Sequence, residues 1–175
     1  MIKNNVIYFA HGMESGPWGT KIKALAKVAE RLGFDVESPD YTSTMDADER
    51  VDMLLNLNPK ANENLVLVGS SMGGYVSTVA SEKIKPQGLF LLAPAFYIPI
   101  FKHQDPKPYA LESLIIHGWN DEIIPAENII RFSQTYKTAL YLVDSNHVLT
   151  DQIPLIESLF ALFLAKILET SKATI

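Results

Sequence analysis

The residues that decide the fold are LVLVGSSMGG, at positions 65–74. Residues 65–68 form a short apolar run without polar alternation, which is typical of a strand buried on both faces of a sheet. We expect a helix over residues 72–84. Glycines mark the short connection between the two as a tight turn, because glycine lacks the side chain that would clash there. The stretch therefore predicts a buried strand, a sharp turn and a helix.

Ser71 lies at the centre of this turn, within the pattern G-x-S-x-G. A serine hydroxyl is a weak nucleophile, and a strained strand-to-helix turn presents it clear of its surroundings at the end of a sheet. Gly69 and Gly73 remove side chains where neighbouring segments come close. The helix that follows directs backbone N–H groups at the same point, which suits an anion that develops during a reaction. We therefore predict that Ser71 is a catalytic nucleophile.

The same alternation of apolar runs and helix-like stretches extends over the whole chain. Continuous apolar runs alternating with helices predict an α/β domain with a mostly parallel sheet. No repeat or linker divides the chain, so we expect one domain over residues 1–175, with residues 94–113 as a short lid-like insertion that holds about one short helix. The expected strands are 6–10, 34–38, 65–68, 88–93, 114–117 and 140–143, and the expected helices are 20–32, 46–57, 72–84, 127–136 and 152–169.

A serine nucleophile needs a general base, and three histidines follow Ser71 in the sequence. His147 comes after the last expected strand and directly before the last helix, where a loop can reach the nucleophile. His117 ends a strand before Gly118 and is interpreted as a turn or packing residue. His103 lies in the proline-rich insertion, where we expect it to face solvent or substrate. The prediction for the base is His147.

The base needs an acid that orients it, and Asp121 is the candidate. It lies in a short loop between an expected strand and an expected helix. Glu122 is the neighbouring alternative, but adjacent loop residues usually point in different directions. Asp144 and Asp151 flank the histidine, where such acids more often face solvent or cap a helix.

Two backbone N–H groups are candidates for an oxyanion hole, the set of donors that stabilises a developing negative charge. Met13 follows His11-Gly12 after the first expected strand, and Met72 directly follows the predicted nucleophile. Both would act through the backbone, so the methionine side chains matter little for this role.

Composition excludes several classes of function. The chain has 15 basic and 20 acidic residues, hence a net charge of −5, which argues against broad nucleic-acid binding. It has no cysteine, so a disulfide framework, cysteine-ligated zinc and a cysteine nucleophile are impossible. The N-terminal apolar run at residues 6–10 is too short for a signal peptide, and no run is long enough for a membrane span. We expect a cytoplasmic protein without a membrane span.

With His11-Gly12, the G-x-S-x-G turn, Asp121 and His147 in this order, the chain resembles the α/β-hydrolase superfamily, in particular its small serine esterases with little or no lid. The resemblance implies a three-layer sandwich with six strands in the order 2-1-3-4-5-6 and a minimal lid. Two departures are the missing antiparallel start of the sheet and the short insertion, which together suggest an open, shallow site.

The resemblance implies hydrolysis of carboxylic esters, with short acyl groups, through an acyl-enzyme and a Ser71–Asp121–His147 triad. No cofactor or metal would be needed, and the partner would be a small-molecule ester or thioester. A thioesterase, or a binding protein that keeps the fold without turnover, remains an alternative function. For the oligomeric state, a monomer and a homodimer are both left open. For the aromatic residues of the insertion, packing on the edge of the sheet is the plainer interpretation. The candidate substrate contacts are Trp18, Phe96, Tyr97 and Trp119.

Overall fold

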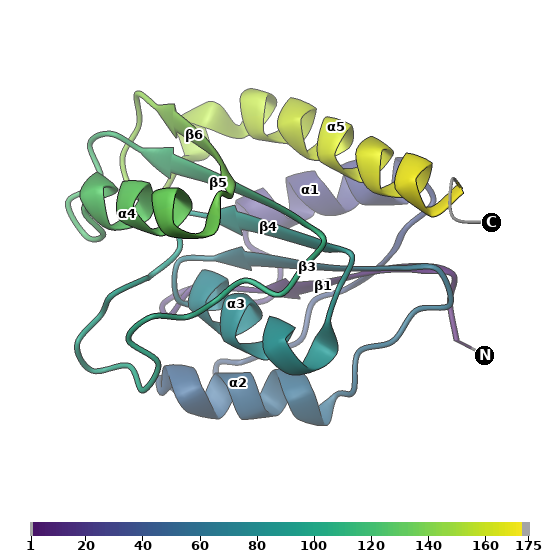
Figure 1. Ribbon diagram of the computed structural model, residues 1–175, viewed down its shortest axis with the longest axis horizontal. Coiled ribbons are helices and arrows are strands. Elements are labelled where there is room, and N and C mark those ends of the chain that lie inside the picture. The colour runs from purple at the N-terminus through teal and green to yellow at the C-terminus, as the bar shows by residue number, and fades with distance from the viewer. Residues whose placement is uncertain (1, 173–175) are drawn as a thin grey trace.

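The computed structural model describes residues 2–172, in which six strands alternate with five helices. Most connections are short, and each strand except β4 is followed by a helix or a helical turn (Figure 1). The strands are β1 (Asn5–Ala10), β2 (Asp35–Glu37), β3 (Asn64–Ser70), β4 (Gly88–Leu92), β5 (Glu112–Gly118) and β6 (Ala139–Val143). The helices are α1 (Thr20–Arg31), α2 (Ala47–Asn56), α3 (Met72–Ile84), α4 (Ala126–Tyr136) and α5 (Ile153–Lys172), with a 3₁₀ turn, η1 (Thr150–Gln152), before the last.

The six strands form one parallel sheet in the order β2-β1-β3-β4-β5-β6. Helices α1 and α5 cover one face, and α2, α3 and α4 cover the other (Figure 1). The predicted fold class and strand order are therefore confirmed. Because all strands are parallel, their carboxyl ends meet at one edge of the sheet, and the loops that leave this edge lie side by side.

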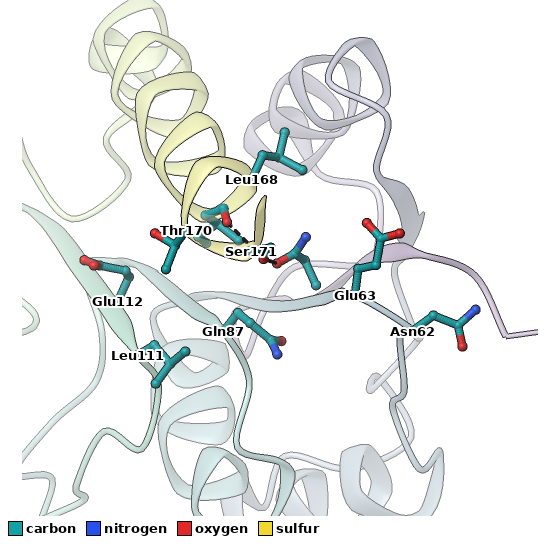
Figure 2. A pocket seen from close by; sticks show the side chains of 10 residues that line it. Asn62, Glu63, Gln87, Leu111, Glu112, Leu168, Thr170 and Ser171 are labelled. Carbon is teal, nitrogen blue, oxygen red and sulfur yellow. Dashed lines mark hydrogen bonds between the residues drawn. The ribbon is translucent and has the colours of Figure 1, made fainter. Parts of the chain in front are cut away.

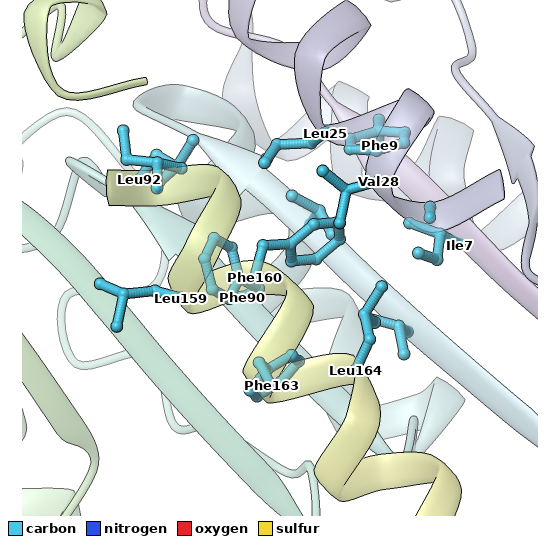
Figure 3. Close-up of a cluster of buried hydrophobic side chains, with 14 of the residues drawn as sticks. Ile7, Phe9, Leu25, Val28, Phe90, Leu92, Leu159, Phe160, Phe163 and Leu164 are labelled. Carbon is cyan, nitrogen blue, oxygen red and sulfur yellow. The ribbon is translucent and has the colours of Figure 1, made fainter. Parts of the chain in front are cut away.

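The core between the sheet and the helices α1 and α5 is rich in aromatic rings (Figure 3). Phe90 of β4 packs against two rings of α5, with centroids 4.8 Å from Phe160 and 5.3 Å from Phe163. Phe90 and Phe160 are completely buried. Burial of each such ring contributes about 1.5–3 kcal/mol through the hydrophobic effect, so this face anchors the last helix firmly to the sheet.

The opposite face forms a second core, with Tyr75 of α3 and Phe132 of α4 among its buried residues. Asp46 directly precedes helix α2, and its carboxylate caps the helix by accepting from the backbone N–H groups of Asp48 and Glu49. Its buried face carries Arg50, a charged residue that is 0% exposed.

The insertion contains no helix among residues 94–111, which corrects the expectation of one, and residues 112 and 113 belong to β5. Four prolines in this segment lack the N–H donors that a helix needs. Instead, the Gln104 side-chain amide donates to the carbonyls of Ile98 and Pro99, and Phe101 packs its ring 4.6 Å from that of Tyr75. The segment is therefore an ordered strap on the α3 side of the sheet.

Candidate active site

Ser71 lies in a strained turn between β3 and α3, with φ 54° and ψ −119°. Its backbone is fixed by the N–H of Ser71, which donates to Leu92, and by its carbonyl, which accepts from Ala95. A side-chain carbon on Gly73 would lie 1.9 Å from the Ala10 carbonyl oxygen, and one on Gly69 would lie 2.2 Å from the Gly73 carbonyl oxygen. Both glycines of the G-x-S-x-G pattern are therefore required by close backbone packing.

Ser71, His147 and Asp121 form a chain of hydrogen bonds. The His147 ring nitrogen Nε2 lies 2.9 Å from Ser71 Oγ, and Nδ1 lies 2.7 Å from Asp121 Oδ2. The Asp121 carboxylate accepts a hydrogen from Nδ1, which leaves Nε2 free to take the proton of the serine hydroxyl. This arrangement can activate a serine as a nucleophile.

Two loops are bonded together so that Asp121 and His147 meet. After β5, the N–H of Trp119 donates to Val143, and the N–H of Asn120 donates to Ser145. Close to His147, the ammonium group of Lys21 on α1 donates to the Val148 carbonyl at 2.5 Å. Burial lowers the pKa of this lysine. Its role in holding the histidine loop was not anticipated, because it depends on a contact between residues far apart in the sequence.

The Asp121 side chain is completely buried, and its second oxygen, Oδ1, accepts from the backbone N–H groups of Ile123 and Ile124 at 2.9 and 2.8 Å. The carboxylate is thus oriented by N–H donors on both oxygens. None of the three alternative acids contacts His147: Glu122 is exposed, Asp144 accepts from Asn120, and Asp151 accepts from Ser145.

His117 lies behind Asp121, with Nε2 2.9 Å from the Ile124 carbonyl oxygen and 3.3 Å from Asp121 Oδ2. Its Nδ1 is buried without a hydrogen-bond partner. Burial lowers the pKa of this imidazole, although the Ile124 carbonyl and Asp121 oppose that shift. His103 is exposed. Of the three histidines after Ser71, only His147 contacts the serine.

The loop after β1 lies against Ser71. A side-chain carbon on Gly12 would be 3.6 Å from Ser71 Cβ and 3.7 Å from the Ser70 carbonyl oxygen. Within residues 2–172, no backbone carbonyl accepts from the N–H of Met13 or of Met72. These two groups, one on the loop after β1 and one at the start of α3, are therefore available donors in the segments next to the serine.

Arg50 holds this loop through hydrogen bonds to its backbone carbonyls and was missed in the sequence analysis. Its guanidinium donates to the carbonyls of Gly12 at 3.1 Å and Met13 at 3.2 Å, with a longer contact of 3.5 Å to His11. Its Nε donates to Thr44 at 2.9 Å. A signal was present, since Arg50 shares the i, i+3, i+4, i+7 helical stripe of three buried apolar residues: Ala47, Val51 and Leu54.

The four aromatic candidates for substrate contact differ in exposure. Trp18 and Trp119 are exposed, at 45% and 55%. Tyr97 is half-buried, with the Arg131 guanidinium 4.3 Å from its ring. Phe96 is completely buried and stacks on Phe132 with ring centroids 4.2 Å apart. The expectation of a substrate contact is wrong for Phe96, because its side chain belongs to the core.

A cavity of about 610 Å³ opens at the opposite edge of the sheet (Figure 2). It is lined at the amino ends of the strands by Asn64 of β3 and Glu112 of β5, and closed by the end of α5. Ser171 donates to the Asn64 side chain there. Because Ser71 follows the carboxyl end of β3, this cavity is separate from the site around the serine.

Among residues 2–172, no three His, Cys, Asp or Glu side chains are grouped in a way that could hold a metal ion. None of the helices in this part of the chain combines the length and the hydropathy needed to cross a membrane.

The solved structures that resemble this chain are α/β hydrolases or share their fold. A protein from Xanthomonas campestris pv. campestris, described as a hydrolase of the alpha/beta superfamily, is 33% identical with a TM-score of 0.87, covering 93% of this chain and 99% of that one. Est1E from Butyrivibrio proteoclasticus is 17% identical with a TM-score of 0.82, covering 95% and 89%. A lid-less serine hydrolase from Xanthomonas campestris is 20% identical with a TM-score of 0.69, covering 95% and 83%. The last two show a likeness of fold alone.

No curated protein matches the chain. The model of an uncharacterised protein family, UPF0227, matches residues 5–107, which is more than half of the chain and includes the Ser71 turn. The 33% identity with the Xanthomonas protein supports hydrolase activity in general. From this match and the 33% identity over almost the whole length of the Xanthomonas protein, the chain belongs to family UPF0227 within the α/β-hydrolase superfamily.

Proposed function

We propose that the protein is a serine hydrolase that cleaves carboxylic esters through an acyl-enzyme, with Ser71 as nucleophile, His147 as general base and Asp121 as the acid that orients it. The observation that carries this proposal is the hydrogen-bonded chain from Ser71 Oγ through His147 to the buried Asp121 carboxylate. It starts at a serine whose strained backbone presents the hydroxyl at the carboxyl edge of the sheet.

In the first half of the reaction, Ser71 Oγ attacks the ester carbonyl carbon while its proton passes to His147 Nε2. The tetrahedral intermediate collapses when the bond from carbon to the alcohol oxygen breaks, and His147 gives its proton to the departing alkoxide. In the second half, water attacks the acyl carbon, His147 takes one proton from the water, and that proton returns to Ser71 as the acid is released. Asp121 stays ionised throughout and stabilises the imidazolium.

The negative charge on the substrate oxygen needs donors that are already in place. The free N–H groups of Met13 and Met72 flank the serine and are our proposed oxyanion hole. Met72 is also the first residue of α3, so the positive end of this helix dipole adds to the same stabilisation.

Exposed apolar side chains surround this edge of the sheet and indicate the kind of ester that fits. They come from the loops after β1, β5 and β6, which also supply Met13, Asp121 and His147. Large apolar side chains are more often buried than exposed. A group of exposed ones around a reactive serine therefore favours a substrate with an apolar acyl or alcohol group. The exposed members are Met13, Trp18, Trp119, Ile123 and Val148.

Hydrolysis of p-nitrophenyl esters from acetate to decanoate tests the proposal. Ser71→Ala should reduce kcat by at least about 10⁴-fold, because the nucleophile is lost while the fold is kept. Ser158→Ala, which removes an exposed hydroxyl on α5, is the matched control and should retain full activity. Turnover that survives in the Ser71 variant would contradict the proposed nucleophile.

Labelling with a fluorophosphonate separates the remaining alternatives, because this probe reacts only with an activated serine. A protein that is labelled at Ser71 but cleaves no p-nitrophenyl ester has an activated serine and a narrower substrate, and matched oxyester and thioester pairs would then distinguish an esterase from a thioesterase. A protein that shows neither labelling nor turnover would contradict the enzyme assignment and favour a binding protein.

A further inference from the structure

We infer that Arg50 is a positioning residue for the oxyanion hole: together with His11 it fixes the peptide unit that carries the Met13 N–H and strengthens that group as a donor. This inference rests on the proposed function, since it concerns how one oxyanion donor is held. It assigns a role to a fully buried cation that takes no part in the Ser71–His147–Asp121 chain.

The first step is that the contacts of Arg50 converge on one short loop. Its guanidinium reaches the carbonyls of three consecutive residues, at 3.5 Å for His11, 3.1 Å for Gly12 and 3.2 Å for Met13. Within residues 2–172, no carboxylate forms an ion pair with it. A buried charge without an acid partner is costly, and its favourable contacts are to the backbone of this loop and to Thr44.

The second step concerns His11, whose protonation state follows from its partners. The backbone N–H of Tyr41 donates to His11 Nε2 at 3.0 Å, so this nitrogen must be unprotonated. The proton therefore lies on Nδ1, which donates to the Gly12 carbonyl at 2.8 Å. Burial and the charge of Arg50 both lower the pKa of this imidazole, in keeping with its neutral form. The Gly12 carbonyl thus accepts from two buried side chains.

The third step is the geometry of the peptide unit. In a trans peptide the C=O and the N–H point in opposite directions. Because the carbonyl of Gly12 is directed at Arg50 and His11, the N–H of Met13 in the same plane must point away from them. The Gly12 backbone lies against Ser71, with an ideal side-chain carbon 3.6 Å from Ser71 Cβ. Two side chains therefore orient a donor that contacts neither of them.

The fourth step is electronic. A carbonyl that accepts hydrogen bonds from a cation is polarised, and this polarisation makes the N–H of the same peptide unit a stronger donor. The positive charge of Arg50, in contact with the carbonyls of this loop, also favours a negative charge that develops at the loop's N–H groups. Both effects increase as the substrate oxygen becomes an anion, so they lower the barrier rather than improve substrate binding.

The experiment compares Arg50→Met and Arg50→Lys with Arg31→Met, a control at an exposed arginine at the end of α1. The readouts are kcat and KM for p-nitrophenyl acetate, and the inhibition constant of a trifluoromethyl ketone, which binds serine hydrolases as an oxyanion. We expect Arg50→Met to lower kcat by about 10- to 100-fold, to change KM by less than about 2-fold, and to weaken the ketone by the same factor as kcat/KM. The control should match the wild type.

Arg50→Lys keeps the test decisive if the methionine variant does not fold. A lysine retains the charge but lacks the planar fork that serves several carbonyls, so a smaller loss in kcat and in ketone affinity, again in equal proportion, is expected. A folded variant with a lower melting temperature but unchanged kcat and ketone affinity would overturn the inference, because a merely structural role predicts that result. Absence of Ser71-dependent turnover in the wild type would instead contradict the proposed function itself.

Discussion

Two buried neutral histidines should make the fold sensitive to mild acid. His11 and His117 are 1% and 0% exposed, and burial is the main cause that lowers both pKa values below 6.5. In the unfolded chain an imidazole binds a proton near pH 6.5. Between that pH and the lower folded-state pKa, the unfolded chain therefore holds more protons than the native protein. The contribution of these two neutral histidines to the free energy of unfolding is fully present above pH 6.5, and it is lost as the pH drops toward the folded-state pKa.

The size of the effect follows from the number of sites. One histidine that stays neutral in the native state costs about 1.4 kcal/mol of stability for each pH unit below its unfolded pKa. Between pH 7.5 and pH 5.5 the upper limit is thus about 1.4 kcal/mol for each site, or about 2.7 kcal/mol for both. Nearby groups reduce this limit, because Asp121 and the Ile124 carbonyl favour protonation of His117, as Asp40 and the Gly12 carbonyl do for His11.

Urea unfolding at pH 7.5 and pH 5.5 measures this loss. The loss should shrink by up to about 1.4 kcal/mol in His117→Asn, while the exposed-site control His103→Asn should behave as the wild type. The comparison uses the change with pH, so any stability lost at both pH values in the variant cancels. An equal pH-dependent loss in His117→Asn and wild type, or an imidazole NMR titration with protonated His117 at pH 5.5 in the native protein, would refute the reasoning.

Two further substitutions test the site. Gly73→Ala should abolish folding or cost more than about 4 kcal/mol, since its new carbon would lie 1.9 Å from a backbone oxygen, whereas Gly16→Ala, which meets nothing within 4 Å, should change the free energy of unfolding in urea by less than about 0.5 kcal/mol. Asp121→Asn should lower kcat on p-nitrophenyl acetate by about 10³- to 10⁴-fold with little change in stability, and Asp144→Asn should not; equal activity of the two would contradict the role of Asp121.

Most of the fold could be predicted from local sequence. A strand covered on both faces has to be apolar throughout, so β3 and β4 are visible as continuous runs. The limits of the elements were less accurate, because polar residues extend the ends of buried strands: β3 begins at Asn64 and β5 at Glu112. The expected helix in the insertion was wrong, since prolines break helical bonding and the segment is held instead by side-chain bonds from Gln104.

The site was predictable where chemistry is tied to chain order and not where it depends on long-range packing. Ser71, Asp121 and His147 each follow a strand, and parallel strands bring their carboxyl ends to one edge. The burial of Phe96 could not be read in this way, because an aromatic residue in a loop packs inward or outward according to its tertiary neighbours. Arg50 is separated from the loop it holds by more than thirty residues, so only its position on a buried helical stripe hinted at a partner.

The most unusual local features of this molecule converge on one edge of the sheet. Ser71 has a positive φ, Asp121 is a completely buried acid, and Arg50 is a buried cation that, among the described residues, has no acid partner. Each costs free energy that an ordinary apolar or glycine residue would avoid, and such costs persist where a site requires them. The cavity of about 610 Å³ lies at the opposite edge, and one of its two charged lining residues, Glu112, is paired with Lys166 at the surface. Strain and burial of charge, rather than the presence of a cavity, therefore support our proposal that this edge holds the active site.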